Sequence, residues 1–348
     1  MNTRILQPDA AALSEAAALI RVGQLVGIPT ETVYGLGADA LNEAAVCAIF
    51  EAKGRPGDNP LIVHIADRTQ LAPLIAGAPS PAAIRLMDAF WPGPLTLIFP
   101  RSEAVPLRTT GGLDTVAVRM PAHPVARELI LHSGCCIAAP SGNRSGRPSP
   151  TTAAHMLEDM AGRIPLILDG GPCGVGVEST VLDVTGEIPR VLRPGGVSPE
   201  QIREICGACE VDAAVMRPLG EGEQARSPGM KYRHYAPRGE LTIFRGEAKA
   251  AANAICAAYG QAERDGKRPL ILALQSNLSR YGARRVRSLG SDATEAARGI
   301  FAALREADGQ GIDAILSEAV GTDGIGLAVM NRLGRAAAFH IIEVDTEE

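Results

Sequence analysis

The sequence predicts an α/β protein of two domains, and three observations carry that prediction. Segments with helical periodicity alternate with short apolar, strand-like segments along most of the 348 residues. Hydrophobic residues make up 46% and charged residues 21% of the chain, which is typical of a globular protein and excludes long disordered, collagenous and coiled-coil architectures. A chain of this length is also near the upper limit for a single hydrophobic core.

The first domain is predicted to span residues 1–206. Asp9 can cap the first helix, and residues 25–29 then form a short buried strand. A second helix runs from Asn42 to Lys53. Further strands are expected at residues 61–65, 95–99, 115–120, 136–140, 165–169, 179–184 and 190–193. Further helices are expected near residues 81–90, 124–132 and 152–161, and a last one from Pro199 to about Cys206.

A second, smaller domain is predicted after a linker. Residues 207–240 lack a sustained period and are rich in Pro and Gly, which is typical of a linker. Residues 241–348 return to the alternating pattern. Strands are expected at residues 241–246, 270–274, 313–320 and 339–344, and helices at 247–259, 292–307 and 326–337. This order favours a largely parallel sheet.

The charge balance excludes a protein that coats nucleic acid. The formal net charge is −5, and residues 1–206 contain 16 Lys and Arg against 20 Asp and Glu. Phosphate-dominated binding needs a basic surface, so any RNA contact would have to be local.

The lack of a recognisable signal peptide or membrane span, together with the irregular cysteine spacing, predicts a cytoplasmic protein. The N-terminal segment carries Asp9 and Glu15 where a signal peptide needs an apolar stretch, and no apolar run is long enough for a membrane span. Seven cysteines without regular spacing predict reduced thiols. Cys206 and Cys209 have no second pair and no neighbouring His, so a coincidence at a helix end is favoured over a zinc site.

A first candidate site follows the second helix. Lys53, Arg55, Asn59 and His64 lie on a connection rich in Gly and Pro, where side chains can converge on a ligand. A compact ammonium and a planar guanidinium together suit a phosphate or a carboxylate. From charge alone, a basic helix end that complements the helix dipole is the favoured explanation.

A second candidate site is the loop at residues 139–151. Ser141, Asn143, Ser145 and Ser149 offer hydroxyls and an amide, and the loop's glycines permit close backbone approach. Such a loop can hold phosphates, although it lacks the Walker A pattern and could also be a plain surface loop.

Three shorter segments add polar groups near strands. Residues 29–37 are expected to form a loop that carries Thr30, Thr32 and Tyr34. Ser179 lies at the mouth of a strand, and Arg119 lies within an otherwise apolar one. An arginine in a strand usually reaches an edge, but it can also hold a carboxylate that has left water.

Eight motifs in order along the chain resemble the threonylcarbamoyl-AMP synthases of the YrdC type. They are PTETVYGLG, KGRPGDNPLIVHI, WPGPLTL, TVAVRMP, APSGNRSGRPSPT, ESTVLD, VLRPG and SPGMKYRHYAP. The resemblance is to the two-domain members in particular. It implies a YrdC-type twisted open α/β sheet domain at residues 1–206, a linker that serves as a lid at 207–240, and a smaller Rossmann-like parallel α/β domain at 241–348.

The resemblance also implies an activity and its substrates. Such enzymes convert L-threonine, bicarbonate or CO₂, and ATP to threonylcarbamoyl-AMP and pyrophosphate. The product passes to the tRNA threonylcarbamoyl-transferase machinery, which modifies the adenosine beside the anticodon. Mg²⁺ is expected to arrive with ATP, and no protein side chain is predicted as a metal ligand.

Specific residues follow from the same motif matches. The implied catalytic tetrad is Lys53, Arg55, Ser141 and Asn143. The residues implied in L-threonine binding are Thr32, His64, Arg119, Ala139 and Ser179. The residues implied in ATP binding are Arg55, Asn59, Thr115, Ser141, Ser149, Arg193 and Tyr235. Gly142 stands where the resemblance leads us to expect Ala, and we expect it to loosen the loop slightly.

Two rival functions and one open role remain. An RNA-binding module without synthase activity is disfavoured by the acidic balance of residues 1–206. Carbamoyltransferases of the hydrogenase-maturation type carry a similar domain, but they are far longer and have zinc-finger cysteine pairs upstream. The composition of residues 227–237, with two Tyr, a His, a Lys and an Arg, predicts a lid over the nucleotide rather than a plain tether. No side chain is an evident general base, and that role stays unassigned.

Overall fold

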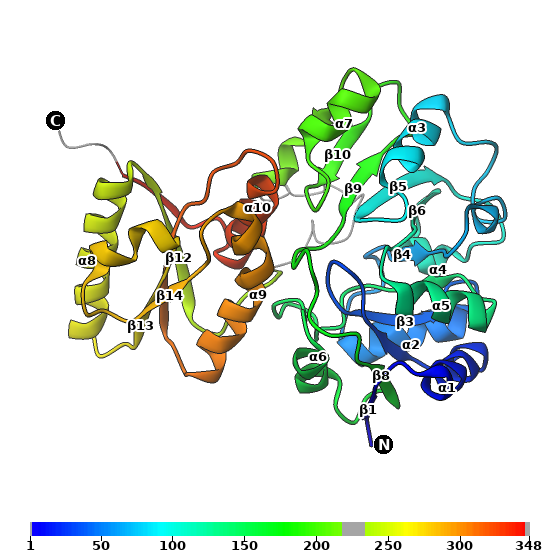
Figure 1. The fold of residues 1–348 in the computed structure, drawn as a ribbon, viewed down its shortest axis with the longest axis horizontal. Coiled ribbons are helices and arrows are strands. Elements are labelled where there is room, and N and C mark those ends of the chain that lie inside the picture. The colour runs from blue at the N-terminus through cyan, green and yellow to red at the C-terminus, as the bar shows by residue number, and fades with distance from the viewer. Residues whose placement is uncertain (1, 218–233, 345–348) are drawn as a thin grey trace. The chain divides into compact units, whose positions relative to one another are not determined.

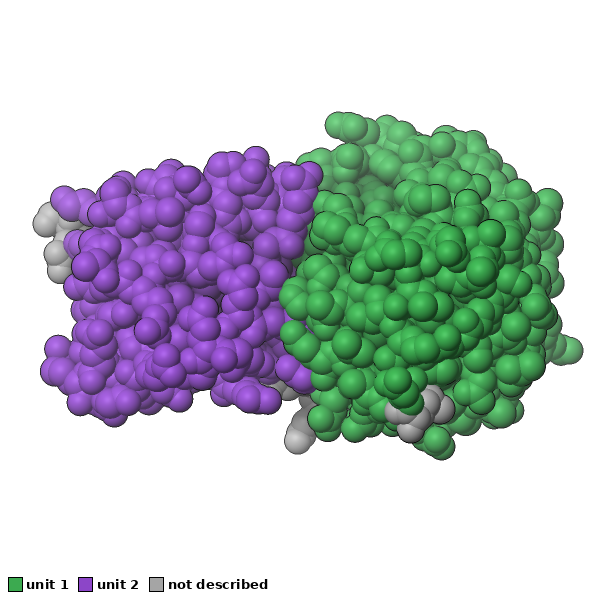
Figure 2. Space-filling view, turned by 60° about the horizontal axis from the view of Figure 1, so that its bottom comes forward, with its two compact units in different colours: residues 1–145, 149–215, 219–232 green, residues 146–148, 216–218, 233–348 purple. Residues whose placement is uncertain are grey.

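The computed structural model describes residues 2–217 and 234–344, which fall into two compact units (Figure 2). Among the described residues, unit 1 holds 2–145 and 149–215, and unit 2 holds 146–148, 216–217 and 234–344. Both units combine helices with a sheet, so the predicted α/β class is confirmed (Figure 1). No helix within the described ranges has both the length and the apolar character that crossing a membrane requires.

The strands of unit 1 form one sheet in the order β1-β8-β2-β3-β7-β4-β6-β5-β9-β10-β11. Parallel and antiparallel pairs are mixed within it; β4 and β6 are parallel, whereas β5 and β6 are antiparallel. The strands are β1 (Arg4–Leu6), β2 (Val26–Ile28), β3 (Gly35–Asp39), β4 (Ile62–His64), β5 (Leu95–Pro100), β6 (Thr115–Arg119), β7 (Ile137–Ala138), β8 (Leu166–Leu168), β9 (Thr180–Asp183), β10 (Arg190–Arg193) and β11 (Glu210–Val211).

Helices cover both faces of this sheet (Figure 1). They are α1 (Ala10–Arg21), α2 (Glu43–Lys53), α3 (Pro81–Phe90), α4 (Leu107–Thr110), α5 (Pro124–Ser133), α6 (Ala153–Met160) and α7 (Pro199–Cys206), with short 3-10 helices η1 (Arg68–Leu71) and η2 (Ala213–Val215). Side chains of α1 and α5 pack with Leu166 and Leu168 of β8, while Ile167 packs on the other face with residues of α2 and α6. This alternation follows from the two-residue period of a strand.

The ends of α2 are those that the sequence predicts. The Asn42 side chain caps the helix by accepting a hydrogen bond from the Ala45 N–H, and Gly54 ends it in the left-handed conformation with φ of 61°. This ending places Lys53 in the last helical turn, at the start of the loop to β4.

Some elements differ from those predicted. Residues 29–37 are not all loop, because Gly35–Asp39 form β3, which pairs with β2 and β7. Its glycine-rich sequence has low intrinsic strand preference, and pairing on both sides overrides that preference. Within the predicted linker, residues 210–211 form β11 beside β10. Residues 218–233, which contain most of the predicted lid, lie outside the described residues.

Unit 2 contains a five-stranded sheet in the order β14-β13-β15-β12-β16, and its pairings are all parallel. Its helix α8 lies on one face, and α9 and α10 lie on the other (Figure 1). The elements are β12 (Glu240–Gly246), α8 (Ala248–Arg264), β13 (Pro269–Ala273), η3 (Gln275–Tyr281), β14 (Val286–Ser288), α9 (Ala293–Gly309), β15 (Ala314–Glu318), α10 (Gly326–Ala336) and β16 (Ile341–Val344). The predicted Rossmann-like parallel character of this domain is confirmed.

Candidate active site

The residues predicted to bind threonine come from the ends of neighbouring strands in unit 1. His64 ends β4 and Arg119 ends β6, and these two residues pair directly because the strands are parallel. Ala139 follows β7, whose Ala138 pairs with Val63 of β4. The parallel register thus places His64 and Arg119 side by side at the ends of β4 and β6, whereas Ala139, whose N–H donates to the Ile62 carbonyl at 3.0 Å, lies at the beginning of β4.

Arg119 is the centre of a buried polar cluster. Its side chain is 4% exposed, and its Nη2 lies 2.6 Å from Oε1 of Glu31. Its Nη1 donates to Oγ1 of Thr32 at 3.0 Å, and its Nε donates to the carbonyl of Gly93 at 3.2 Å. Thr32 in turn lies 2.8 Å from the hydroxyl of Thr30. A guanidinium held in this way presents a fixed, desolvated positive charge to a carboxylate.

His64 enters this cluster as a neutral ring. It is fully buried, and burial followed by the nearby charge of Arg119 lowers its pKa to about 3. Its Nδ1 lies 3.1 Å from the carbonyl of Ile62. At neutral pH the ring can form hydrogen bonds with a ligand but contributes no charge.

Ser179 connects the threonine residues to a residue predicted to bind ATP. Its hydroxyl lies 2.8 Å from that of Thr96, which pairs with Arg119 across β5 and β6. Arg193 donates to the Ser179 carbonyl at 3.0 Å and to its hydroxyl at 3.2 Å. Ser179 therefore contacts Arg193 directly and is linked to the strand pair of Arg119 through Thr96.

Lys53 joins α2 to the loop after β7. Its side chain is buried, and its Nζ donates to the carbonyl of Ser141 at 2.5 Å and to that of Asn143. The Ser145 N–H donates back to the carbonyl of Lys53 at 2.9 Å. Three members of the implied tetrad thus meet, and the ammonium both fixes the loop and puts a positive charge beside it.

Arg55 and Asn59 lie on the adjoining loop. Arg55 braces it by donating to the carbonyls of Pro60 at 3.1 Å and Asn59 at 3.4 Å. Asn59 is 2% exposed, and its side-chain Oδ1 accepts no hydrogen bond from the residues that the structure describes. A buried acceptor without a donor costs free energy, so this amide is suited to a donor on a ligand.

The other predicted ATP residues are more scattered. Ser149 donates to Oε1 of Glu178 at 2.6 Å. Thr115 is the first residue of β6, at the opposite end of that strand from Arg119, so the structure does not bring these two together. Tyr235 lies in unit 2, with its ring centroid 5.1 Å from that of Phe301 and the guanidinium of Arg332 5.6 Å from its ring centre.

Gly142 does not simply loosen its loop. Its N–H donates to the Tyr34 carbonyl at 2.7 Å. A Cβ at this position would lie 2.8 Å from Sδ of Met156, a fully buried side chain of α6. The expected Ala would therefore crowd Met156, and glycine is the residue that fits beside it.

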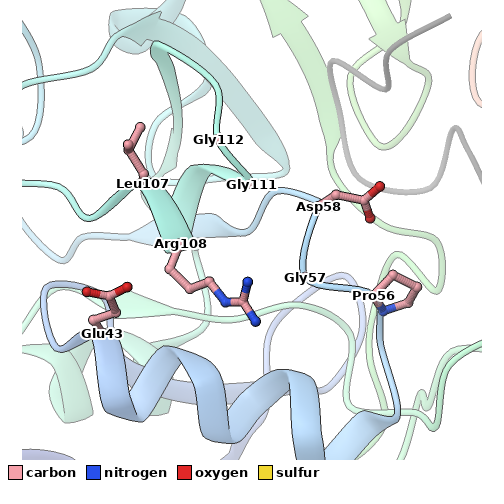
Figure 3. A pocket seen from close by; sticks show the side chains of 8 residues that line it. All are labelled: Glu43, Pro56, Gly57, Asp58, Leu107, Arg108, Gly111 and Gly112. Atoms are coloured by element: carbon pink, nitrogen blue, oxygen red, sulfur yellow. The ribbon is translucent and has the colours of Figure 1, made fainter. Parts of the chain in front are cut away.

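A hollow of about 610 Å³ lies beside the Arg55 loop (Figure 3). It is lined by Glu43, Pro56, Gly57, Asp58, Leu107, Arg108, Gly111 and Gly112. The Arg108 side chain extends between α2 and the loop, 5.3 Å from the ring centre of Phe50 (Figure 3). A Cβ on Gly57 would lie 2.7 Å from its guanidinium, so a larger residue there would require the Arg108 side chain to shift. Arg108 supports the segment that separates Arg55 from Asn59.

Sequence reasoning missed the partners of three polar residues of the site. Glu31 pairs with Arg119, Thr96 with Ser179, and Glu178 with Ser149. Glu31, Thr96 and Glu178 each stand next to another polar residue or inside an apolar strand. The pattern of a single sequence does not indicate which distant residue such a side chain will contact. An acidic residue between two threonines in a strand-end loop, as at Glu31, was the one available hint.

This chain is similar to known proteins along almost its whole length. A family model described as "Telomere recombination" (Sua5, YciO and YrdC) matches residues 18–195, and one described as "Threonylcarbamoyl-AMP synthase, C-terminal domain" matches residues 197–338. The threonylcarbamoyl-AMP synthase of Pyrococcus abyssi is 50% identical over 94% of this chain and 95% of its own length. That of Bacillus subtilis is 48% identical over 95% of this chain and 94% of its own. A crystal structure of P. abyssi Sua5 complexed with L-threonine superposes with a TM-score of 0.92 and 48% identity over 99% of both chains.

Proposed function

The chain belongs to the family of two-domain threonylcarbamoyl-AMP synthases, and from that premise we propose that it joins L-threonine, bicarbonate and ATP into threonylcarbamoyl-AMP and pyrophosphate. The observation that carries the proposal is the buried cluster around Arg119. A fixed guanidinium, a neutral imidazole and several hydroxyls match the carboxylate, amine and hydroxyl of a free hydroxy amino acid.

In this proposal Arg119 binds the threonine carboxylate. Thr32, His64 and Ser179 surround the remaining polar groups, and the backbone at Ala139, which lies beside Ile62 at the beginning of β4, is a further proposed contact. Burial of these residues limits water around the short-lived threonine carbamate, which would otherwise be lost to solvent.

The loop fixed by Lys53 receives the phosphates. Lys53 and Arg55 neutralise negative charge, and Ser141, Asn143 and Ser149 offer donors along the loop. Four further residues are proposed to line the ATP site, namely Asn59, Thr115, Arg193 and Tyr235. The carbamate oxygen attacks the α-phosphorus, the bond to the β-phosphate breaks, and pyrophosphate leaves.

Mg²⁺ would be held mainly by the nucleotide. The described residues contain no group of three His, Cys, Asp or Glu side chains that could hold a metal ion. The hydroxyl and carbonyl oxygens of the loop are hard donors, which fit an ion that retains several waters and phosphate ligands. The ion would neutralise phosphate charge.

We further propose that the product serves tRNA modification, and that any tRNA contact is local. The test is pyrophosphate release by the purified full chain with ATP and Mg²⁺, in the absence of RNA. Release that requires both threonine and bicarbonate supports the synthase. Absence of release under all conditions, or release that ignores threonine, would overturn it and favour the RNA-binding alternative.

A further inference from the structure

Glu31 is an acidic side chain of the threonine cluster that has no role in the assignments above. Its carboxylate is 16% exposed and faces Arg119 at 2.6 Å. The backbone N–H groups of Ala122 and of Glu31 itself also approach the carboxylate and help to lower its pKa, but within the described residues neither oxygen accepts a hydrogen bond of good geometry. A desolvated carboxylate with unused acceptor capacity is costly to keep, and it is suited to a donor that arrives with a ligand.

The backbone holds this carboxylate in place. The N–H of Val175 donates to the Glu31 carbonyl at 2.8 Å, and the N–H of Gly176 donates to that of Thr32 at 3.1 Å. On the other side, the Thr30 hydroxyl accepts hydrogen bonds from the N–H groups of Thr32 and Val33, each at 3.2 Å. Glu31 therefore sits on a segment fixed from two directions.

The pair of Glu31 and Arg119 matches a zwitterionic amino acid in charge. Threonine brings a carboxylate and an ammonium group on one carbon atom, and the cluster offers a cation and an anion in contact. When the substrate carboxylate replaces Glu31 on Arg119, the freed Glu31 carboxylate faces the ammonium. That ammonium cannot attack carbon until it loses a proton, because its nitrogen lone pair is held in an N–H bond.

We propose that Glu31 binds the ammonium of threonine and accepts one proton from it, which makes Glu31 the general base of carbamate formation. This inference rests on the proposed synthase function. The nitrogen lone pair then attacks the carbon of bicarbonate and an N–C bond forms. The C–OH bond of bicarbonate breaks, and its hydroxyl leaves as water with the second amine proton. Glu31 returns its proton to solvent after the product has left.

The groups that face Glu31 leave it as the anionic base of the cluster. His64 of β4 has its pKa lowered to about 3 by burial and by Arg119, and burial also lowers the pKa of His123, which precedes α5. Burial raises the pKa of Cys173, in the loop after β8, to about 12, so it stays a thiol. Among the described residues, Arg119 of β6 is the charged side chain that pairs with Glu31.

Substrate binding would itself strengthen the base. Burial acts to raise the pKa of Glu31, but the charge and hydrogen bonding of Arg119 outweigh it and keep the pKa below its ordinary value. Once the threonine carboxylate neutralises Arg119, the effect of burial dominates and the pKa rises toward that of the amine. Transfer of a proton from the threonine ammonium to Glu31 then costs less free energy.

The test compares Glu31→Gln with the natural chain and with Glu204→Gln, a matched change at an exposed position of α7. Glutamine keeps the shape of the side chain but accepts no proton. We expect Glu31→Gln to lower kcat/KM for threonine at least about a hundredfold at pH 7. Its rate relative to the natural chain should then rise by about tenfold per pH unit, because the fraction of threonine that is already deprotonated rises in that way.

The outcomes separate this inference from the proposed function. If the natural chain releases no threonine-dependent pyrophosphate, the proposed function fails. If the natural chain is active and folded Glu31→Gln loses activity by a constant factor at every pH, or loses none, Glu31 is not the base. Should Glu31→Gln not fold, Glu31→Asp decides. A variant that can still take the proton should keep the pH profile of the natural chain at a lower rate, and a changed profile would overturn the assignment.

Discussion

Replacing Arg119 by Met should destabilise the protein in a manner that depends on pH. The substitution removes one partner of an ion pair whose side chains are 4% and 16% exposed, so solvent screens the loss only weakly. Breaking a buried pair by removing one partner costs about 3–5 kcal/mol, because the other charge stays buried. Arg119 also gives up its hydrogen bonds to Gly93 and Thr32. We therefore expect a loss of about 3–5 kcal/mol in the free energy of unfolding at pH 7.

The sign of the pH dependence follows from Glu31. In the natural chain its pKa lies below the ordinary 4.5, so its contribution to stability is present above that pH and is lost as the pH falls through the folded value. In Arg119→Met only burial remains among the large causes, and it raises the pKa of Glu31. The protonated form is then the favoured one in the folded state, so stability is lost as the pH rises through the raised value. The deficit relative to the natural chain should shrink toward acid pH.

Thermal and denaturant unfolding between pH 4 and pH 8 would measure this effect. The double variant Arg119→Met/Glu31→Gln should recover a large part of the loss at pH 7, because it buries no unpaired charge. Calorimetry should show that Arg119→Met binds threonine at least about 30-fold more weakly, from a loss of about 2–5 kcal/mol. A deficit that is equal at all pH values, or unchanged threonine affinity, would refute the role given to Arg119.

Four further outcomes are expected. Lys53→Ala or Arg55→Ala should each lower threonylcarbamoyl-AMP formation at least about a hundredfold, and near-normal turnover in a folded variant would contradict their placement beside the phosphates. Arg108→Ala should raise the KM for ATP more than it changes kcat, because Arg108 supports the loop between Arg55 and Asn59; steady-state kinetics would measure this, and an unchanged KM would remove that role. ATP should slow protease cleavage within residues 227–237 of the full chain, and identical cleavage with and without ATP would make that segment a plain spacer. A chain that ends at Gly207 should fold yet lose most synthase activity, and full activity there would lead to the same conclusion.

The parts of the fold that the sequence predicts well depend on local signals. The cap at Asn42 and the left-handed Gly54 are properties of a few adjacent residues, and apolar strands such as β5 stand out by composition. The strand β3 was missed because Gly35–Asp39 extends through pairing with β2 and β7, one of which lies about a hundred residues away. Such pairing overrides weak local preference.

The candidate site was predictable as a set of residues but not as a set of contacts. Motif resemblance singled out Lys53 and Arg119, both of which are buried, yet it could not indicate that Lys53 holds the carbonyls of Ser141 and Asn143. For Glu31 the sequence offers only its position between two threonines, because its importance comes from Arg119, which lies 88 positions further along the sequence. Contacts of this kind depend on the register of β4, β6 and β7.

The close fit of Met156 between two glycines implies that substitutions there are not independent in evolution. A Cβ at Gly27 or at Gly142 would lie 2.8 Å from its Sδ, and Met156 itself is fully buried. Ala at position 142 should therefore cost about 1–3 kcal/mol when introduced alone, and less in a chain that already carries a smaller side chain at position 156. Homologues with Ala at position 142 are accordingly expected to have reached it after, or together with, a loss of side-chain volume at position 156.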